Sequence, residues 1–257
     1  MICAGNTDVG MKRNVNQDSF ILKSYSEKTC LCIVCDGMGG ARGGCEASKI
    51  ACDKFVSIID DFVTPYIGNK TKKLQGSDIE RAMLDAVYQA NTAVHDYALI
   101  HPTLKGMGTT LVACLIIRNS IFCVNVGDSR AYLMHGGKIK QITKDHSYVQ
   151  HLIEIGELTE QEAENFPNKN IITRAVGTEQ EVKADLVRHT VADGTYMLLC
   201  SDGLTNFVSD EGILDMVTKA DEKHLDQVKL SLTVRKLIDS ANTNGGGDNI
   251  TAILVRF

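Results

Sequence analysis

The sequence lacks several features that would place it outside the ordinary globular proteins. Its longest apolar runs, such as Leu111 to Ile117, are strand-sized and fall far short of the roughly 20 residues needed to cross a bilayer. The N-terminus has no basic region followed by an apolar stretch, which argues against a signal peptide. Only three prolines occur and no Ser/Gly linker divides the chain. With 257 residues, 44% of them hydrophobic, the chain is predicted to form one large domain with a substantial core.

A concentrated basic surface is also missing. The formal net charge is −5, and the densest basic group, Lys70, Lys72 and Lys73, lies in a polar segment. A solvated loop is the expected structure there, because duplex binding needs several phosphate contacts on one face. Nucleic acid and membrane are therefore not expected as partners.

Cysteine, in contrast, is abundant, with nine residues. Without a signal peptide, this number predicts free thiols in a reducing compartment, the cytoplasm. Cys30, Cys32 and Cys35 fall in one apolar run, where a strand places the first two on one face and the third on the other. A zinc site is the less favoured alternative, because no second cysteine pair has zinc-finger spacing. We expect thiols that pack inside a strand.

The apolar patterns predict a mixture of long helices and hairpin-linked strands. Runs rich in β-branched residues predict strands at Thr29–Cys35, Thr109–Ile117, Ser120–Val126, Ala131–His135, Thr195–Cys200 and Asn249–Val255. Helical periodicity predicts helices at Glu46–Phe62, Asp78–Ala98, Ser209–Thr218 and Asp226–Ala241. Turn residues at Asn119-Ser120 and Gly136-Gly137 predict two hairpins. This combination favours antiparallel sheets with helices packed outside them.

A polar stretch between His146 and Ile172 interrupts the strand pattern. It contains two short helical patterns, Tyr148–Ile155 and Thr159–Asn165, and the second begins with a capping box in which Glu162 takes the third helical position. A mobile flap over a site and a plain surface excursion both fit this pattern. His146 and His151 are expected on its surface.

Four aspartates lie at or beside predicted strand ends, each next to a glycine or another turn former. They are Asp36 in CDGMGG, Asp128 in VGDSR, Asp202 in CSDGL and Asp248 in GGGDN. Strand ends gather at one edge of a sheet, and carboxylates brought together there repel each other unless a cation intervenes. Oxygen ligands without histidine or cysteine suit Mg²⁺ or Mn²⁺ far better than Zn²⁺.

Two further residues extend this set. Asp18, in VNQDSF, follows a strand-like start, and Arg13 lies five residues before it. The guanidinium of Arg13 has the fork of donors that holds a phosphate by two hydrogen bonds. Two divalent ions bridged by a carboxylate, with an arginine beside them, are suited to in-line attack on phosphorus. The residues alone therefore indicate a two-metal phosphoryl hydrolase.

Eight motifs in this chain are similar, in order and spacing, to those of the metal-dependent type 2C protein phosphatases. They are TDVGMKRNVNQDSF, VCDGMGG, GMGTTL, VGDSRAY, DHSYVQHLIEIGELT, IITRAVG, CSDGL and GGGDNITAILV. The sequence most resembles the bacterial Ser/Thr phosphatases, over nearly its whole length. The resemblance implies an α-β-β-α sandwich of two antiparallel sheets, in a single catalytic domain over residues 1–257 with a flap at about 146–170.

The resemblance also implies a reaction and its partners. A hydroxide that bridges two Mn²⁺ or Mg²⁺ ions would attack the phosphorus of phosphoserine or phosphothreonine, which opposes Ser/Thr kinases. The expected partners are phosphoprotein substrates and a cognate kinase, and the expected state is a monomer.

The resemblance further implies a role for each site residue. Asp36 would bridge both metals, and Asp202 and Asp248 would complete the first site. The Gly37 carbonyl would bind the second metal, with Asp18 there directly or through water. Arg13 would hold the substrate phosphate. Asp128, with Asp202, corresponds to the ligands of a third and weaker metal, which Ser147 of the flap would approach.

One departure from the family pattern concerns the general acid. The family usually carries a histidine either directly after Asp-Gly or after the GMGG run, and here those positions are Met38 and Ala41. Such a histidine is commonly assigned to protonate the leaving alkoxide, a contribution of roughly 10²–10⁴-fold. Its absence leaves a catalytically weak, phosphoprotein-binding regulatory module as the alternative. A phosphatase for one small phosphoprotein would use the same active site as a general one.

Overall fold

The computed structural model describes residues 1–67, 74–163, 166, 171–219 and 226–257. The strands are β1 Ile2–Asp8, β2 Asp18–Ser26, β3 Thr29–Met38, β4 Gly108–Thr109, β5 Leu111–Ile117, β6 Ser120–Val126, β7 Arg130–His135, β8 Lys138–Gln141, β9 Asp185–Thr190, β10 Tyr196–Cys200 and β11 Ile250–Arg256. The α-helices are α1 Ala41–Val63, α2 Gly76–Ile100, α3 Tyr148–Glu154, α4 Glu160–Ala163, α5 Asp202–Thr205, α6 Asp210–Lys219 and α7 Gln227–Thr243, with short 3-10 turns at Thr64–Tyr66 and Pro102–Leu104. None of these helices is long and apolar enough to cross a membrane.

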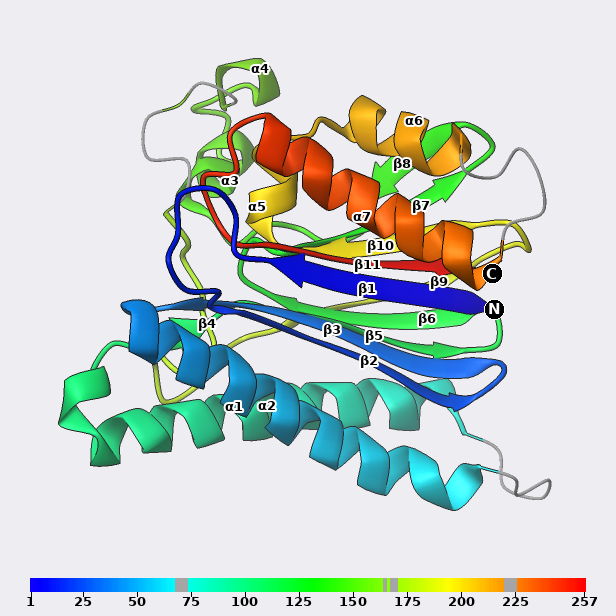
Figure 1. Ribbon diagram of the computed structural model, residues 1–257. Coiled ribbons are helices and arrows are strands. Elements are labelled where there is room, and N and C mark those ends of the chain that lie inside the picture. The colour runs from blue at the N-terminus through cyan, green and yellow to red at the C-terminus, as the bar shows by residue number, and fades with distance from the viewer. Residues whose placement is uncertain (68–73, 164–165, 167–170, 220–225) are drawn as a thin grey trace.

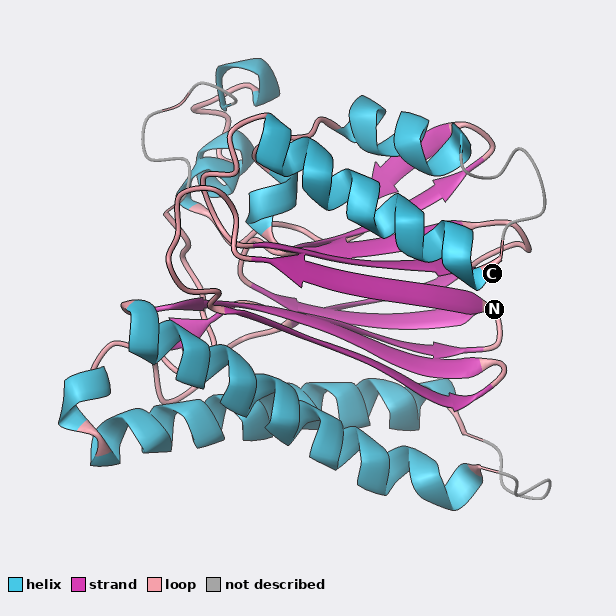
Figure 2. Cartoon of the chain, in the orientation of Figure 1, coloured by secondary structure: helices cyan, strands magenta, loops and turns pink. Residues whose placement is uncertain are grey.

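These elements build four layers (Figure 1, Figure 2). One antiparallel sheet has the strand order β1-β11-β10-β7-β8, and the other has the order β2-β3-β5-β6-β9, with β4 paired to β3. Helices α1 and α2 cover the second sheet, and α6 and α7 cover the first. The predicted α-β-β-α sandwich is confirmed. The predicted basic group at Lys70, Lys72 and Lys73 lies outside the described residues.

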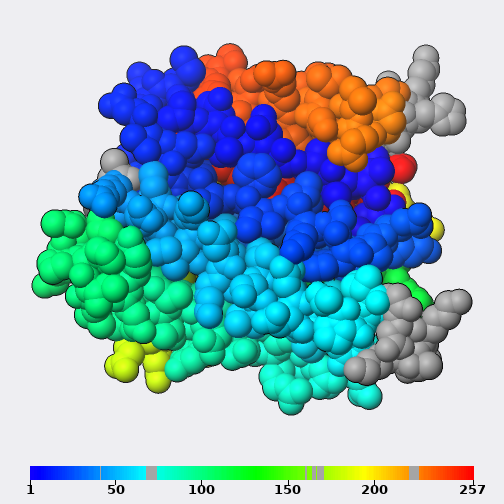
Figure 3. Space-filling model, turned by 60° about the horizontal axis from the view of Figure 1, so that its bottom comes forward, coloured from blue at the N-terminus to red at the C-terminus, as the bar shows by residue number. Residues whose placement is uncertain are grey.

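The two helical layers pack through the faces that the periodicity predicted. Phe55 and Ile59 of α1 and Met83 of α2 are fully buried against Leu31 and Ile33 of β3. Figure 3 shows α1 and α2 side by side over this side of the molecule. On the opposite side, α7 packs against the other sheet in the same way.

The cysteines of β3 pack as predicted. Cys30 and Cys32 face the space between the sheets, together with Val34, whereas Cys35 faces α1. All nine cysteines are free. Burial raises the pKa of Cys35 well above its ordinary value and that of Cys200 to about 12. These thiols are therefore inert packing groups, not oxidation-sensitive ones.

The strands that the sequence patterns missed lie at the edges of the sheets. The edge strands are β1 and β8 in one sheet and β2 and β9 in the other. Such strands are only partly covered, so they carry polar residues that mask the alternation of a buried strand. Asp18 was predicted to follow a strand-like start, but it is the first residue of β2.

The two predicted hairpins are present, with one shift. Gly136 and Gly137 join β7 to β8 with φ values of 57° and 72°, the positive φ that this turn requires. In the β5–β6 hairpin Ser120 pairs with Ile117, so the turn residues are Arg118 and Asn119 and not Asn119-Ser120.

Five chain segments meet at one end of the sandwich, on the left in Figure 1. The ends of β3, β6 and β10 and the starts of β2 and β11 all lie there, as the antiparallel pairing requires. The chain termini lie at the other end, where Ile2 pairs with Arg256. Every predicted aspartate lies at or beside one of these five strand ends.

Candidate functional site

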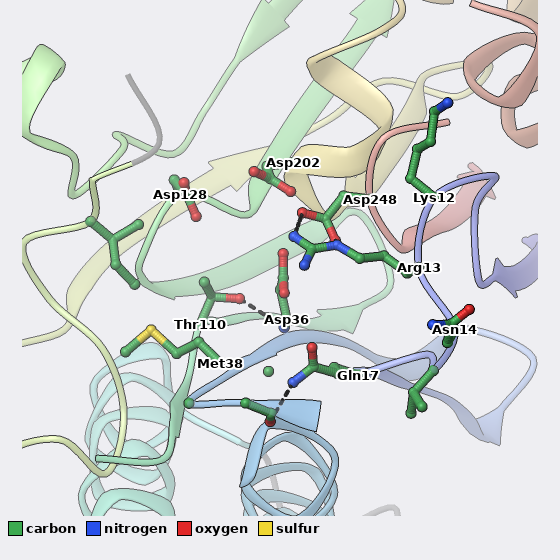
Figure 4. A pocket seen from close by; sticks show the side chains of 15 residues that line it. Lys12, Arg13, Asn14, Gln17, Asp36, Met38, Thr110, Asp128, Asp202 and Asp248 are labelled. Atoms are coloured by element: carbon green, nitrogen blue, oxygen red, sulfur yellow. Dashed lines mark hydrogen bonds and ion pairs between the residues drawn. The ribbon is translucent and has the colours of Figure 1, made fainter. Parts of the chain in front are cut away.

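A cavity of about 600 Å³ opens at this end of the sandwich. Six of the seven predicted site residues line it, namely Arg13, Asp36, Gly37, Asp128, Asp202 and Asp248. Figure 4 shows the four aspartates converging on its centre, with Arg13 at the side. The seventh residue, Asp18, does not line the cavity but lies directly behind it, opposite Asp36 in the β2–β3 register.

The local structure explains how each aspartate reaches the site. Asp36 stands near the end of β3, and its backbone N–H donates to Thr110 Oγ1 at 2.9 Å. Asp128 follows β6 in a turn, and Asp202 is the first residue of α5, directly after β10. Asp248 precedes β11. Turns and strand ends therefore present all four carboxylates to the same cavity.

Gly37 occupies a position that only glycine fits. A Cβ atom built there would clash with the backbone of Gly44 and would lie 2.7 Å from the carbonyl oxygen of Gln17. Helix α1 begins at Ala41 and not at the predicted Glu46, so Gly44 belongs to its first turns. The glycine-rich run is thus part of the helix and brings it against the site.

Asp18 ties the two sheets together behind the cavity. Its Oδ2 accepts hydrogen bonds from Ser201 Oγ at 2.8 Å and from Thr251 Oγ1 at 2.6 Å. Its Oδ1 is buried and accepts no hydrogen bond from any residue that the structure describes. A buried carboxylate oxygen without a donor is costly unless a cation or water serves it.

Arg13 forms a two-point ion pair at the mouth of the cavity. Its Nε donates to Asp248 Oδ1 at 2.9 Å, and its Nη2 donates to Asp248 Oδ2 at 2.8 Å. This pairing raises the pKa of Arg13, so the side chain is always charged. Half of the Arg13 side chain, 50%, is exposed, which leaves it accessible to a ligand.

The clustered carboxylates hold their protons unusually strongly. Burial, and then the charge of Asp18, raise the pKa of Asp36 well above its ordinary value. Burial raises the pKa of both Asp18 and Asp128 to about 7, and the charge of Asp202 adds to this in each case. Burial and the charge of Asp248 raise the pKa of Asp202. Such a site favours a bound cation, which removes the mutual repulsion.

The free energy of unfolding of EDTA-treated protein is expected to fall as the pH rises from about 4 to about 7. In this window the folded carboxyls still hold protons that the unfolded chain has released, so the folded state binds more protons and loses stability with rising pH. Urea unfolding at several pH values measures this slope. Asp36→Asn is expected to make it shallower, and Mn²⁺ to remove most of it. A stability that rises across the window in EDTA would contradict the account.

The donor set fits divalent metal ions. Both Asp18 and Asp202 keep a buried Oδ1 that accepts no hydrogen bond within the described part of the chain. All of the candidate ligand atoms are oxygens, which Mg²⁺ and Mn²⁺ prefer. Within the described ranges, no three His, Cys, Asp or Glu side chains are close enough to enclose an ion by themselves. Water molecules would therefore complete the coordination, as is usual for Mg²⁺.

Asn249 is a supporting residue that the sequence patterns did not identify. Its Oδ1 accepts from the Gln17 N–H at 2.8 Å, and its Nδ2 donates to the carbonyls of Val9 and Val15 at 2.9 and 3.1 Å. It thereby holds the loop that carries Arg13. The available sequence signal was a polar asparagine directly after Asp248, at the start of an apolar run, because a buried polar side chain needs hydrogen-bond partners.

His146 is buried, so the prediction that it lies on the surface was wrong; only 5% of the residue is exposed. The ring Nδ1 of His146 accepts a hydrogen bond from the Gly127 N–H at 3.1 Å, and the backbone N–H of His146 donates to the Gly127 carbonyl at 2.9 Å. Its Nε2 lies 3.3 Å from Asp185 Oδ2. Burial lowers the pKa of His146, so the neutral ring acts as a hydrogen-bonding clamp beside Asp128. His151 is exposed, as predicted.

His146→Ala is expected to lower the free energy of unfolding by about 2–3 kcal/mol, because the buried Gly127 N–H loses its acceptor. His146→Asn, whose Oδ1 stands near the position of Nδ1, should restore about 1 kcal/mol of this loss. Urea denaturation of the three proteins provides the comparison. Equal losses in both variants would show that the ring fills space and does not act as an acceptor.

The segment after His146 forms two short helices, α3 and α4. Ser147 caps α3 by accepting from the Gln150 N–H at 3.2 Å. The predicted capping box is present, since Thr159 N–H donates to Glu162 Oε2 at 2.9 Å and the Glu162 N–H donates to Thr159 Oγ1 at 3.3 Å. Asn165 and Asn170, which end the predicted helix and flap, lie outside the described residues.

No histidine lines the described part of the cavity wall. Met38 stands where the family pattern has a histidine after Asp-Gly, and its side chain lies beside Thr110 (Figure 4). The sequence departure therefore corresponds to a real difference in the site.

Comparisons with known proteins agree with this site. The family model described as "Protein phosphatase 2C" matches residues 11–238. The chain is 36% identical to the Ser/Thr phosphatase stp of Listeria innocua over 251 residues, which cover 97% of this chain and 93% of that protein.

Solved structures give the same answer. The Ser/Thr phosphatase Stp1 of Staphylococcus aureus superimposes with a TM-score of 0.86 at 33% identity, covering 100% of this chain and 95% of that one. The catalytic domain of PstP in complex with two manganese ions superimposes with a TM-score of 0.80 at 33% identity, covering 98% and 96%. The chain therefore belongs to the protein phosphatase 2C family and is a metal-dependent protein Ser/Thr phosphatase.

Proposed function

We propose that the aspartate cluster holds two Mn²⁺ or Mg²⁺ ions and that the protein uses them to remove phosphate from phosphoserine and phosphothreonine in other proteins. The observation that carries this proposal is the convergence of Asp36, Asp202 and Asp248 on one cavity, where Asp202 keeps a buried oxygen without a donor. When bound, such ions lower the pKa of a water molecule and neutralise charge on the phosphoryl oxygens.

The proposed ligand of each ion is the one that the family resemblance implies. Asp36 would hold both ions, and Asp202 and Asp248 would complete the first site. The Gly37 carbonyl would serve the second site, with Asp18 there directly or through water. Asp128 and Asp202 would hold a third and weaker ion. Both of these aspartates line the cavity, which supports this assignment.

Arg13 is proposed to bind and orient the phosphate. Its Nε and Nη2 donate to Asp248 at the mouth of the cavity, so a phosphate would bind Nη1 or replace this ion pair, and the planar guanidinium matches two phosphoryl oxygens. Hydrogen bonds from Asn249 hold the loop on which it stands. The loop therefore presents a charged group at a fixed place without blocking the cavity.

We assign residues of about 146–170 to a flap within a single catalytic domain. A bridge between Ser147 and Ile172 joins the two ends of this segment, and Ile172 lines the cavity. The segment thus begins and ends beside the site while α3 and α4 project from it (Figure 1). This arrangement is suited to contact with a bound phosphoprotein.

We further propose a monomer that acts in the cytoplasm on the products of a cognate Ser/Thr kinase, without a nucleic acid or membrane partner. Nine free cysteines favour a reducing compartment. The alternative of a non-catalytic phosphoprotein-binding module is not favoured, because the complete set of aspartates is present and converges on one site.

Hydrolysis of a phosphothreonine peptide and of p-nitrophenyl phosphate tests the proposal. After EDTA treatment, Mn²⁺ or Mg²⁺ is expected to restore turnover of both substrates. Absence of turnover of both substrates, in protein that is folded and binds Mn²⁺, would overturn it.

A further inference from the structure

A second cavity, of about 860 Å³, opens beside the aspartate cluster. It lies between the segment 147–163 and the segment 202–211, and it shares Asp128 and Asp202 with the first cavity. We call it the side pocket. Because the two cavities share these walls, a side chain in the side pocket belongs to a residue close to the one that carries the phosphate.

Part of the side pocket is apolar. Val149, Ile153 and Ala163 line it from α3 and α4, and Phe207 and Val208 line it from the α5–α6 connection. A long aliphatic stem that packs between these two walls would be stabilised in proportion to the apolar area that it buries.

Among the described residues of the wall, the one cation is Arg130, and it is already paired with a carboxylate. Arg130 Nε donates to Asp145 Oδ2 at 2.9 Å, and its Nη2 donates to the same oxygen at 2.7 Å. Its Nη1 donates to Tyr132 Oη at 3.0 Å. Gln141 also donates to Asp145, at 2.8 Å. Three of the five N–H groups of Arg130 are used in this network, and the carboxylate of Asp145 offsets its positive charge.

Two carboxylates of the wall remain without a counter-charge. Asp210 and Glu211 lie in the first turn of α6 and line the side pocket. Across the described ranges, neither side chain makes a hydrogen bond or an ion pair. Acidic residues also stabilise a first helical turn, but that role does not require them to face a cavity. With Asp128 and Asp202 assigned to metal ions, the pocket retains a net negative charge beside apolar walls.

We propose that the side pocket binds a lysine or arginine side chain that flanks the phosphoserine or phosphothreonine of the substrate. The aliphatic stem packs between Val149, Ile153 and Phe207, and the cation meets Asp210 and Glu211. This inference rests on the proposed phosphatase function and names the substrate class that the site prefers.

Paired peptides test it. Each peptide carries one phosphothreonine and, at one position from −4 to +4, either arginine or its neutral isostere citrulline. For the wild type with Mn²⁺, kcat/KM is expected to be roughly tenfold higher with arginine at one or two positions. In the double variant Asp210→Asn/Glu211→Gln, the arginine-to-citrulline ratio at those positions is expected to fall to about one.

A matched variant separates the pocket from the overall charge of the protein. Asp85→Asn/Asp239→Asn removes the same two charges from exposed faces of α2 and α7, and it should keep the wild-type ratio. An arginine-to-citrulline ratio of about one in the wild type, or a ratio that stays high in the Asp210→Asn/Glu211→Gln variant, overturns the proposal that the side pocket binds a basic side chain. In either case, hydrolysis of the citrulline peptides leaves the proposed phosphatase function intact. No hydrolysis of any peptide overturns both.

Discussion

Replacing Asp36 by asparagine is expected to lower metal-dependent turnover of a phosphothreonine peptide by about a thousandfold or more. Asp36 stands in the centre of the carboxylate cluster, and the charges of Asp18, Asp202, Asp128 and Asp248 all act on it. A neutral amide cannot serve two cations, so both ions should bind more weakly.

The same substitution is expected to stabilise the EDTA-treated protein, because it removes one of several like charges from a buried place. Activity and stability should therefore move in opposite directions, which general damage to the fold would not produce. Phosphate release and urea unfolding, measured beside an exposed control such as Asp85→Asn, give both values. Activity within tenfold of the wild type would show that Asp36 does not bridge the metals.

The second large effect concerns the missing histidine. Hydrolysis is expected to depend more steeply on the pKa of the leaving group than in a relative with a histidine after Asp-Gly, because no histidine lines the described part of the cavity. Aryl phosphates such as p-nitrophenyl phosphate need less protonation and should remain good substrates. A series of aryl and alkyl phosphates measures the slope, and equal slopes in the two enzymes would count against this explanation.

Met38→His extends this test within one chain. Met38 already lines the cavity, and a histidine there is expected to raise turnover of alkyl phosphates by roughly a hundredfold, the lower end of general acid catalysis. It should also add a basic limb to the pH profile of kcat. Met38→Gln, which has similar volume but no acid near neutral pH, is the control. Equal gains in both variants would indicate a packing effect.

The buried elements and the metal-facing aspartates could be predicted because their signals are local. Ser120–Val126 was identified to the residue, since apolar β-branched runs mark strands that are covered on both faces. Asp36, Asp128, Asp202 and Asp248 each stand beside a strand end and a turn former, and strand ends share an edge of the sheet. Their convergence therefore followed from sequence position before any distance was known.

Other features depend on contacts between distant segments and leave no local signal. The burial of His146 arises from its two hydrogen bonds to Gly127, nineteen residues earlier. The position of Asp18 behind the cavity depends on Ser201 and Thr251 of the other sheet. The ion pair between Arg13 and Asp248 joins opposite ends of the chain. A local sequence pattern reflects one segment at a time and therefore does not reveal contacts of this kind.

The most direct test of the two-metal centre is anomalous diffraction from crystals soaked in Mn²⁺. The account predicts two strong manganese peaks in the cavity, both close to Asp36, one also contacting Asp202 and Asp248 and the other the Gly37 carbonyl. A single peak, or peaks only at other carboxylates, would contradict the proposal that Asp36 bridges two ions.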